Sequence, residues 1–312
     1  MHMSDALLSL PVAGAFWAVS GTALVVSTRH LAKDSDSSRA PRMGVLAAFV
    51  FAAQMINFAL PGTGSSGHIA GAVLLSLLLG PWAAFVALTS VLTVQALFFG
   101  DGGILALGAN IFNMGFLACF LVIPLIYRPL VLGQVSQTRK RLAVMVAAVA
   151  AATLGALCVT LQTTASGLSQ LPFRNFALIM IPVHLAIGLV EGFISILILE
   201  QVGVFHAEVK LGATWNRKTF ATVGLATLLV AGGLSRFASI KPDGLNFSVE
   251  KMGANLVNAP GSLNAKLSAW QGGAAIHSGP GSGLAGLLGA GIVFFIALLI
   301  SWIFRSKKNN SL

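Results

Sequence analysis

The chain has 312 residues, of which 56% are hydrophobic and only 9% are charged, and its mean hydropathy is +0.87. A soluble domain carries about 25% charged residues, so this composition excludes an ordinary soluble globule, and its hydrophobicity excludes a disordered chain. The net charge of +10 more often sets topology in a membrane protein than it attracts nucleic acid, so we expect a membrane protein with lipid, and not nucleic acid, as its surroundings.

Nine apolar segments are candidates for membrane-spanning helices, because a helix needs about 20 apolar residues to cross a bilayer. In chain order they cover residues 6–27, 43–60, 69–80, 83–100, 104–127, 142–165, 176–204, 219–236 and 284–304. The third segment is short and ends before Pro81; joining it to the fourth as one tilted helix would leave eight spans. The sequence therefore predicts an all-α, multi-pass integral membrane protein.

The positions of the basic residues favour nine spans over eight. With nine spans and an outer N-terminus, most of the 19 Lys and Arg residues fall in cytoplasmic loops. With eight spans this bias would reverse after residue 69, so the positive-inside rule favours nine, with the C-terminus in the cytoplasm. The first residues lack the basic region of a cleaved signal peptide, so we expect Met1 to remain the N-terminus.

The chain divides into two predicted parts. Residues 1–204 hold seven spans, residues 205–218 form a polar and basic cytoplasmic linker, and residues 219–312 form a two-span hairpin. The hairpin has a long outer loop at 237–283 that is rich in Gly, Asn, Ser and Pro, so we expect turns and irregular structure there. No internal repeat is evident, which speaks against an inverted-repeat secondary transporter.

His2 follows directly after the N-terminal amine, and this arrangement can chelate a divalent metal through three nitrogens. The Met1 amine and the His2 amide nitrogen close a five-membered ring, and the amide and Nδ1 of His2 close a six-membered ring. His68, which the topology also places outside, can supply a fourth nitrogen. Planar nitrogen donors suit Ni(II) or Cu(II), whereas Zn(II) prefers a tetrahedron. From these residues alone, a frayed His2 and an interfacial His68 are the alternative.

Two ionisable residues, His184 and Glu191, lie seven positions apart in the seventh span and therefore on one helix face. Such residues are costly in a membrane and are often functional. The alternative is a buried polar pair that locks helix packing. Their spacing is not the H-E-x-x-H of a zinc protease.

Several amide side chains lie in or near the spans and are expected to hydrogen-bond between helices or to orient metal ligands. These are Gln54, Asn57, Gln95, Asn110 and Asn113. A separate stripe of small residues, Gly44, Ala48 and Ala52, allows close helix packing in the second span. It can face another span of this chain or a partner subunit, and both alternatives are open.

No segment has the features of a nucleotide-binding loop. The glycine-rich run at 279–283 follows no strand and contains no lysine, so we exclude a P-loop there. We therefore expect no nucleotide to bind this chain and no enzymatic activity in it. If transport is driven by ATP, another chain must hydrolyse it.

Four segments resemble one protein family: MHMSDALL at 1–8, FAAQMINFALPGTGSSGHIAG at 51–71, VQALFFGDGGILALGANIFNMG at 94–115 and HLAIGLVEGFIS at 184–195. They resemble the substrate-binding components of energy-coupling factor transporters for nickel and cobalt, and the resemblance covers residues 1–204. The hairpin, with PDGLNFSVEKM at 242–252, resembles the small accessory subunit of the same family, here fused to the C-terminus. One departure is Met3, where many relatives carry isoleucine.

The resemblance implies that Met1, His2 and His68 bind the metal and that the accessory hairpin assists metal loading. It implies a prokaryotic cell membrane, a transmembrane coupling subunit and cytoplasmic ATPase subunits as partners. The candidate contact with the coupling subunit is the stripe of small residues in the second span. The candidates for holding the ligands or gating the site are Asn57, Ser66, Asn110, His184 and Glu191.

The wording of these motifs resembles that of the nickel-type members, so we expect Ni(II) as the transported substrate. The first alternative is Co(II) uptake by the same architecture. A second is a membrane metalloenzyme that uses His184 and Glu191, although no third ligand stands at a matching spacing. A third is a passive metal channel without partners.

Overall fold

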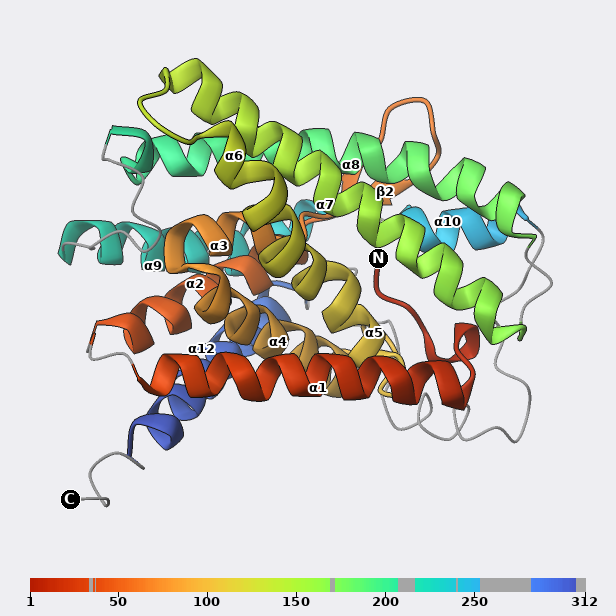
Figure 1. Cartoon of the computed structure of the whole chain (residues 1–312), viewed down its shortest axis with the longest axis horizontal. Coiled ribbons are helices and arrows are strands. Elements are labelled where there is room, and N and C mark those ends of the chain that lie inside the picture. Colours follow the sequence, from red (N-terminus) through yellow and green to blue (C-terminus); the bar gives the residue numbers. More distant parts are fainter. Residues whose placement is uncertain are drawn as a thin grey trace.

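The structure is a computed structural model that describes residues 1–33, 36, 38–168, 172–206, 217–239, 241–252 and 282–306. Its helices form an elongated bundle (Figure 1). Six helical segments within these ranges are long and apolar enough to cross a membrane. They are α1 (Leu10–Ala32), α4 (Pro81–Phe98), the continuous segment of α5 (Leu107–Ile111), η2 (Phe112–Tyr127) and α6 (Arg128–Leu130), α7 (Gln137–Ser166), α8 (Phe173–Gln201) and α12 (Ser282–Ser306).

The other three predicted spans are shorter helices: α2 (Arg39–Gln54), α3 (Ala72–Leu79) and α9 (Arg217–Gly232). At 1.5 Å per residue, α3 is about 12 Å long, well short of the apolar core of a bilayer, which is about 30 Å thick. Every residue of α3 is buried. The predicted span at 69–80 therefore contains only a short helix inside the bundle, too short by itself to cross the membrane.

A sharp break separates α3 from α4. Gly80 has a φ of +82°, a conformation that glycine adopts without steric cost, and Pro81 begins the next helix at its first position. Proline is favoured there because its missing N–H needs no partner. One continuous helix over 69–100 is therefore excluded.

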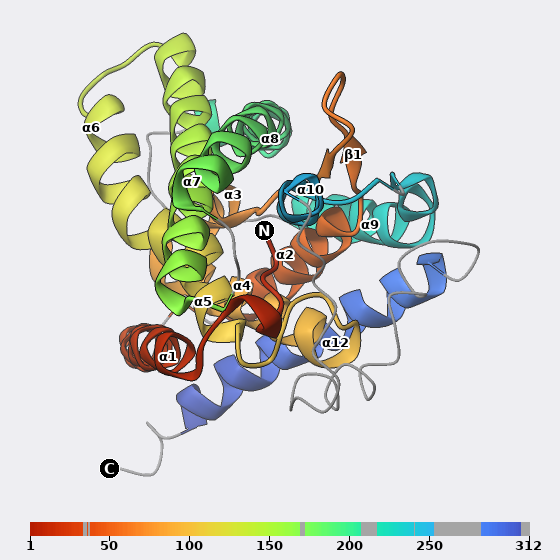
Figure 2. The ribbon, with the colours of Figure 1, turned by 90° about the vertical axis from the view of Figure 1, so that its right-hand side faces the viewer.

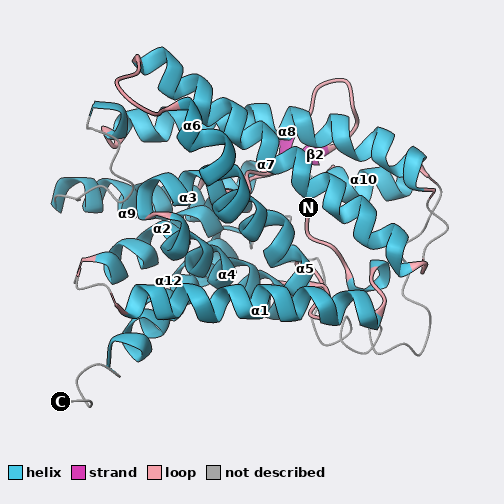
Figure 3. Ribbon diagram, in the orientation of Figure 1, coloured by secondary structure: helices cyan, strands magenta, loops and turns pink. Residues whose placement is uncertain are grey.

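A two-stranded antiparallel hairpin follows α2. Strand β1 (Phe58–Ala59) pairs with β2 (Ser66–Gly67), so that Phe58 lies opposite Gly67 and Ala59 opposite Ser66 (Figure 3). The all-α prediction missed this element, and it ended the second span at residue 60 although α2 ends at Gln54. The hairpin leads directly into His68.

The C-terminal part contains α9, η4 (Leu234–Phe237), α10 (Gly244–Lys251) and α12. Helix α10 lies inside the loop that was expected to be irregular. Its N-cap is Asp243, whose Oδ1 accepts a hydrogen bond from the main-chain N–H of Asn246 at 2.8 Å, a favourable start for a helix. Residues 253–281 of the predicted loop and 207–216 of the predicted linker lie outside the described residues.

The C-terminal part packs on the rest of the chain mainly through α12, which lies against α2, α4 and α9 (Figure 2). A Cβ atom added to Gly44 would come within 2.9 Å of the Phe294 ring. Ala48 and Ala52 lie on the same stripe and are buried. Gly44 therefore faces another helix of this chain, which favours the first of the two alternatives for the stripe over a coupling-subunit contact.

The helix ends that carry basic residues lie together. Figure 1 shows at its left the C-terminal ends of α1 and α8, the N-terminal ends of α2 and α9, and the turn between α6 and α7. Among them are Arg29, Arg39, Arg139 and Arg217. The N-terminus lies inside the bundle, toward the opposite end.

Candidate metal centre

The first residues of the chain run into the bundle and are not part of a spanning helix. Met1 and His2 are each 8% exposed and Met3 is fully buried, and α1 begins only at Leu10. The prediction that the first span starts at residue 6 is therefore corrected. Burial of His2 also contradicts the alternative of a frayed terminal residue.

Hydrogen bonds hold this N-terminal segment along its backbone. The Met3 N–H donates to Asn110 Oδ1 at 2.8 Å, and the Met3 carbonyl accepts from Asn110 Nδ2 at 3.2 Å and from the Gly103 N–H at 2.8 Å. Further along, Asp5 Oδ1 accepts from the Ala106 N–H at 2.9 Å. Asn110 thus fixes the residue next to His2, a role that its position near a span predicted.

A chain of amide hydrogen bonds sets the orientation of the His2 ring. Gln54 Nε2 donates to the Ala70 carbonyl at 2.7 Å, so its Oε1 accepts from Gln95 Nε2, also at 2.7 Å. Gln95 Oε1 then faces His2 Nε2 at 3.2 Å. Because this oxygen only accepts, Nε2 carries the proton and Nδ1 presents its lone pair. That nitrogen is buried without a hydrogen bond, 3.4 Å from Asp101 Oδ1.

His68 lies beside His2 with a matching orientation. Its Nδ1 donates to the Ile69 carbonyl at 3.0 Å, which leaves Nε2 with a lone pair. The two ring centroids are 5.0 Å apart. Two imidazoles that bind one ion at about 2.0 Å and at right angles have centroids about 4–5 Å apart, so both rings can reach one metal ion.

Burial keeps both imidazoles in the uncharged form that binds a metal. Loss of hydration lowers the pKa of His2. Burial, with the charge of the Met1 ammonium and the neighbouring His2, lowers the pKa of His68 to about 3. Both rings are therefore neutral at pH 7 and need not lose a proton before they coordinate.

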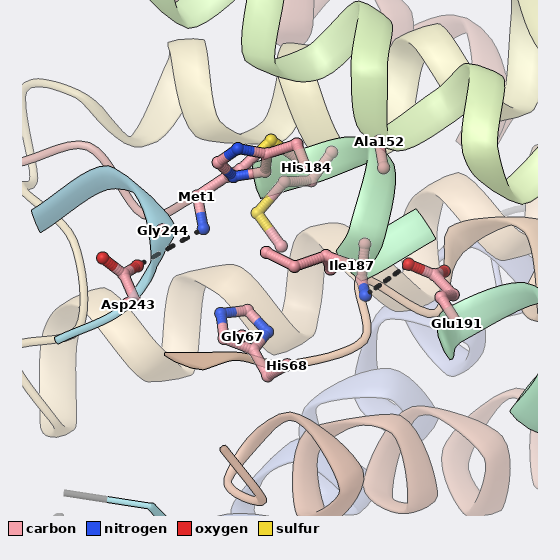
Figure 4. Close-up of a pocket in the computed structure, with 11 residues that line it drawn as sticks. Met1, Gly67, His68, Ala152, His184, Ile187, Glu191, Asp243 and Gly244 are labelled. Carbon is pink, nitrogen blue, oxygen red and sulfur yellow. Dashed lines mark hydrogen bonds and ion pairs between the residues drawn. The ribbon is translucent and has the colours of Figure 1, made fainter. Parts of the chain in front are cut away.

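Asp243 of the C-terminal part reaches the N-terminal amine, with its Oδ2 3.5 Å from the Met1 nitrogen (Figure 4). Burial alone would raise the pKa of Asp243, but the Met1 ammonium and the Asn246 N–H hold it below its usual value. No residue of the hairpin was predicted for this role. The sequence Pro-Asp-Gly at 242–244 was the available signal, but it does not indicate a contact with the N-terminal amine.

Glu191 holds the loop that carries His68. Its two carboxylate oxygens accept from the N–H groups of Ala70 and Gly71, each at 2.9 Å. Glu191 and His184 both line the pocket that contains Met1 and His68, but each makes its hydrogen bond elsewhere, His184 Nδ1 to the Met180 carbonyl at 2.9 Å. Glu191 therefore acts on the ligand loop through main-chain contacts.

Ser66 and Asn57 join the two parts of the chain. The Ser66 N–H donates to the Pro242 carbonyl at 2.8 Å and its Oγ to the Lys241 carbonyl at 2.7 Å. The Asn57 carbonyl accepts from the Ser239 N–H at 2.7 Å. Ser66, two residues before His68, thus ties the ligand loop to the C-terminal part, and neither Ser66 nor Asn57 lines the pocket.

Side chains alone do not complete a metal site here. Among the described residues, no group of three or more His, Cys, Asp or Glu side chains is arranged to hold a metal ion. A centre at His2 and His68 would therefore need further donors, and the buried Met1 amine and His2 amide are main-chain nitrogens of the same segment.

Comparison with known proteins matches nearly the whole chain. Residues 2–209 match the family described as the cobalt uptake substrate-specific transmembrane region, and residues 217–306 match the PDGLE domain. A putative metal transport protein of Haloquadratum walsbyi is 36% identical over 195 residues, which are 62% of this chain and 86% of that protein. A putative fused nickel transport protein of Archaeoglobus fulgidus is 34% identical over 67% of this chain and 68% of its own length.

The fold agrees with these matches. The crystal structure of a truncated transition metal transporter is 36% identical, with a TM-score of 0.56, over 67% of this chain and all of that one. The family is one of transport proteins, so the alternative of a membrane metalloenzyme falls away. The chain belongs to the family of cobalt-uptake substrate-specific transmembrane components, and it is a multi-pass nickel or cobalt transport component that ends in a PDGLE domain.

Proposed function

We propose that this chain is the substrate-specific subunit of an energy-coupling factor transporter and captures Ni(II) outside the cell for ATP-driven uptake. Four nitrogens bind the ion: the Met1 amine, the His2 amide, His2 Nδ1 and His68 Nε2. The observation that carries the proposal is the convergence of Met1, His2 and His68 in one buried place. Both rings there present a bare nitrogen.

The surrounding residues prepare this donor set. Asn110 fixes the main chain at Met3, which orients the peptide that contains the His2 amide. Gln95 orients the His2 ring, and Glu191 orients the His68 loop. Four nitrogens in one plane favour Ni(II), and binding releases the protons of the amine and the amide.

Partner subunits follow from what this sequence lacks. It contains no P-loop, so a cytoplasmic ATPase and a membrane coupling subunit supply the energy. The basic helix ends gathered at one end of the bundle favour a cytoplasmic location for that end, with the metal centre toward the outside. Co-purification of the tagged chain with an ATPase subunit is the expected result, and purification as a lone, freely conducting channel contradicts it.

Co(II) is the second candidate substrate, because the matched family is described by cobalt uptake. A competition series in which Ni(II) and Co(II) displace each other from the purified chain separates the two. Preference for Ni(II) supports the planar nitrogen site, since Co(II) accepts other geometries. Preference for Co(II) would change the proposed substrate from Ni(II) to Co(II) but would leave the proposed ligand residues unchanged.

The central experiment measures nickel binding to three purified forms: the native chain, a chain with one glycine before Met1, and His2→Ala. Intact mass first verifies that Met1 is the terminal residue of the native form. The native chain is expected to show the absorption band of square-planar nickel, and both altered forms to lose it, because each breaks the chelate. An unchanged band in the extended form excludes the amine as a ligand.

A further inference from the structure

His184 is a second imidazole in the pocket that His68 lines, and the nitrogen set above leaves it without a role. It comes from the middle of α8 and is only 1% exposed. Its Nδ1 donates to the Met180 carbonyl at 2.9 Å, so its Nε2 presents a lone pair. This nitrogen is buried and has no hydrogen-bond partner among the described residues. An unsatisfied buried acceptor is costly and calls for a functional explanation.

The orientation of His184 is the one that metal-binding histidines adopt. Such histidines donate one ring N–H to a carbonyl or carboxylate and bind the metal through the other nitrogen. His68 has the same arrangement, with Nδ1 donating to the Ile69 carbonyl at 3.0 Å. Figure 4 shows His184 and His68 around one pocket together with Met1 and Asp243.

The C-terminal part packs against this imidazole. A Cβ atom added to Gly244 would lie 3.0 Å from Cε1 and 3.4 Å from Nε2 of His184, so the first residue of α10 lies directly against the ring. Asp243, the preceding residue, is fixed by its bond from the Asn246 N–H at 2.8 Å. Its other oxygen faces the Met1 amine at 3.5 Å. His184 and Asp243 thus line one pocket together with Met1 and His68.

We infer that His184 Nε2 and the Asp243 carboxylate form a transit site, which receives the divalent cation before it passes to Met1, His2 and His68. The inference rests on the proposed function, and it concerns how the same ion reaches the planar nitrogens. The planar set requires an amide nitrogen to lose its proton, whereas His184 and Asp243 present their donor atoms as they stand. Nitrogen and oxygen donors together accept Ni(II) and Co(II) alike.

The position of Asp243 gives the transfer a direction. The carboxylate that receives the cation is the one that pairs with the Met1 ammonium. When the cation takes this carboxylate, the ammonium loses its counter-charge at the moment when the metal lies next to it. The ammonium then gives its proton to water, and the resulting amine can bind the ion as the first nitrogen of the planar set.

The first test follows the growth of the planar nickel band after purified full-length chain is mixed with nickel chloride. His184→Ala and Asp243→Asn are each expected to slow loading by about tenfold or more, and in His184→Ala the final band and the equilibrium affinity stay as in the native chain. Asparagine keeps the N-cap, so α10 is preserved. His30→Ala is the control, because His30 stacks on Trp82 outside the pocket, and it is expected to load at the native rate.

The second test removes the planar set and looks for the transit site alone. His2→Ala is expected to retain one weakly held nickel without the planar band, and His2→Ala combined with His184→Ala to lose it. If the native chain shows no planar band, the proposed function fails. If the native band is present but both single variants load at the native rate, or if adding His184→Ala changes nothing in the His2→Ala chain, only the transit site fails. His184→Gln replaces His184→Ala if the latter does not fold.

Discussion

At the scale of single residues, the orientation of the His2 ring depends on two glutamines that lie behind it. Gln54 is anchored on the Ala70 carbonyl, and this fixes the direction of the Gln95 amide and so the proton on His2 Nε2. Both glutamines were predicted to hydrogen-bond between helices or to orient metal ligands, without named partners. Their order in the chain of hydrogen bonds depends on α2, α4, the N-terminal segment and the loop before α3 meeting, which a sequence pattern does not contain.

Replacing Gln95 tests this orientation. Gln95→Leu removes the acceptor for the His2 N–H, and nickel affinity is expected to fall by about 10- to 100-fold, the usual effect of losing a residue that orients a metal ligand. Gln95→Glu is the matched variant, because a carboxylate still accepts from His2 Nε2, although it no longer donates to Gln54 Oε1. Equilibrium titration with nickel should show a smaller loss of affinity in Gln95→Glu than in Gln95→Leu, and equal losses in both variants would contradict the role.

The pH dependence of nickel binding separates the amine and amide from the imidazoles. Binding removes protons from Met1 and the His2 amide, so affinity falls as the pH falls, by at most about 100-fold per unit. His68, with its pKa lowered to about 3, stays neutral between pH 8 and pH 5 and adds nothing to this slope. Equilibrium dialysis of native chain and His68→Ala over this range should give weaker binding but the same slope in the variant. A flat native curve would overturn the chelate.

At the scale of elements, the loop between β2 and α3 carries His68 and is held from behind by α8. Glu191 accepts two main-chain N–H groups of this loop and is 3% exposed. Both oxygens of this carboxylate accept from main-chain N–H groups. If the loop moved, the carboxylate and these N–H groups would lose their partners in the protein interior.

Glu191→Gln turns one of these acceptors into a donor. The variant is expected to lose about 1–3 kcal/mol of stability, since a buried N–H then lacks an acceptor, and to bind nickel more weakly because the His68 loop is less well held. The matched control on the same helix is Glu200→Gln. Glu200 pairs with Arg141 at 2.6 Å in a partly exposed position, where an ion pair contributes little. Thermal unfolding in detergent should give a lower melting temperature for Glu191→Gln than for Glu200→Gln. Equal melting temperatures would refute the role of Glu191 in holding the loop.

The elements differ in how far their sequences predict them. The long apolar runs predicted α1, α7 and α8 because a span that faces lipid must be apolar along its length. The same signal predicted a full crossing at α3, because hydropathy does not distinguish burial by lipid from burial by protein. Strands β1 and β2 are two residues each, too short for any alternating pattern.

At the scale of the whole molecule, the interface between the two parts depends on close packing of α12 against α2. Gly44→Val is expected to destabilise the chain by about 1–3 kcal/mol, because the added atoms overlap the Phe294 ring. Gly14→Ala is the control, since nothing lies within 4 Å of its added Cβ, and it should be neutral or slightly stabilising. Thermal unfolding measures both, and an unaffected Gly44→Val would show that α12 does not pack tightly there.

Contacts between distant parts of the chain were the least predictable feature. Asp243 and Met1 are far apart in the sequence. A carboxylate or an amine alone can pair with many oppositely charged groups, so neither residue by itself predicts the other as its partner. The resemblance predicted that the hairpin assists metal loading, but the residue that reaches the amine follows only from the fold. The position of His184 in a span was predicted, whereas its bare nitrogen in the pocket depends on the Met180 carbonyl.

The bond from the Ser66 N–H to the Pro242 carbonyl lies between parts of one polypeptide. Such tethering gives the second segment an effective concentration that is typically in the millimolar range for a short flexible tether. Closure of the turn over the ligand loop is then an intramolecular equilibrium. It does not depend on how many copies of the protein the membrane holds, so each copy carries both of the segments that meet at the ligand loop.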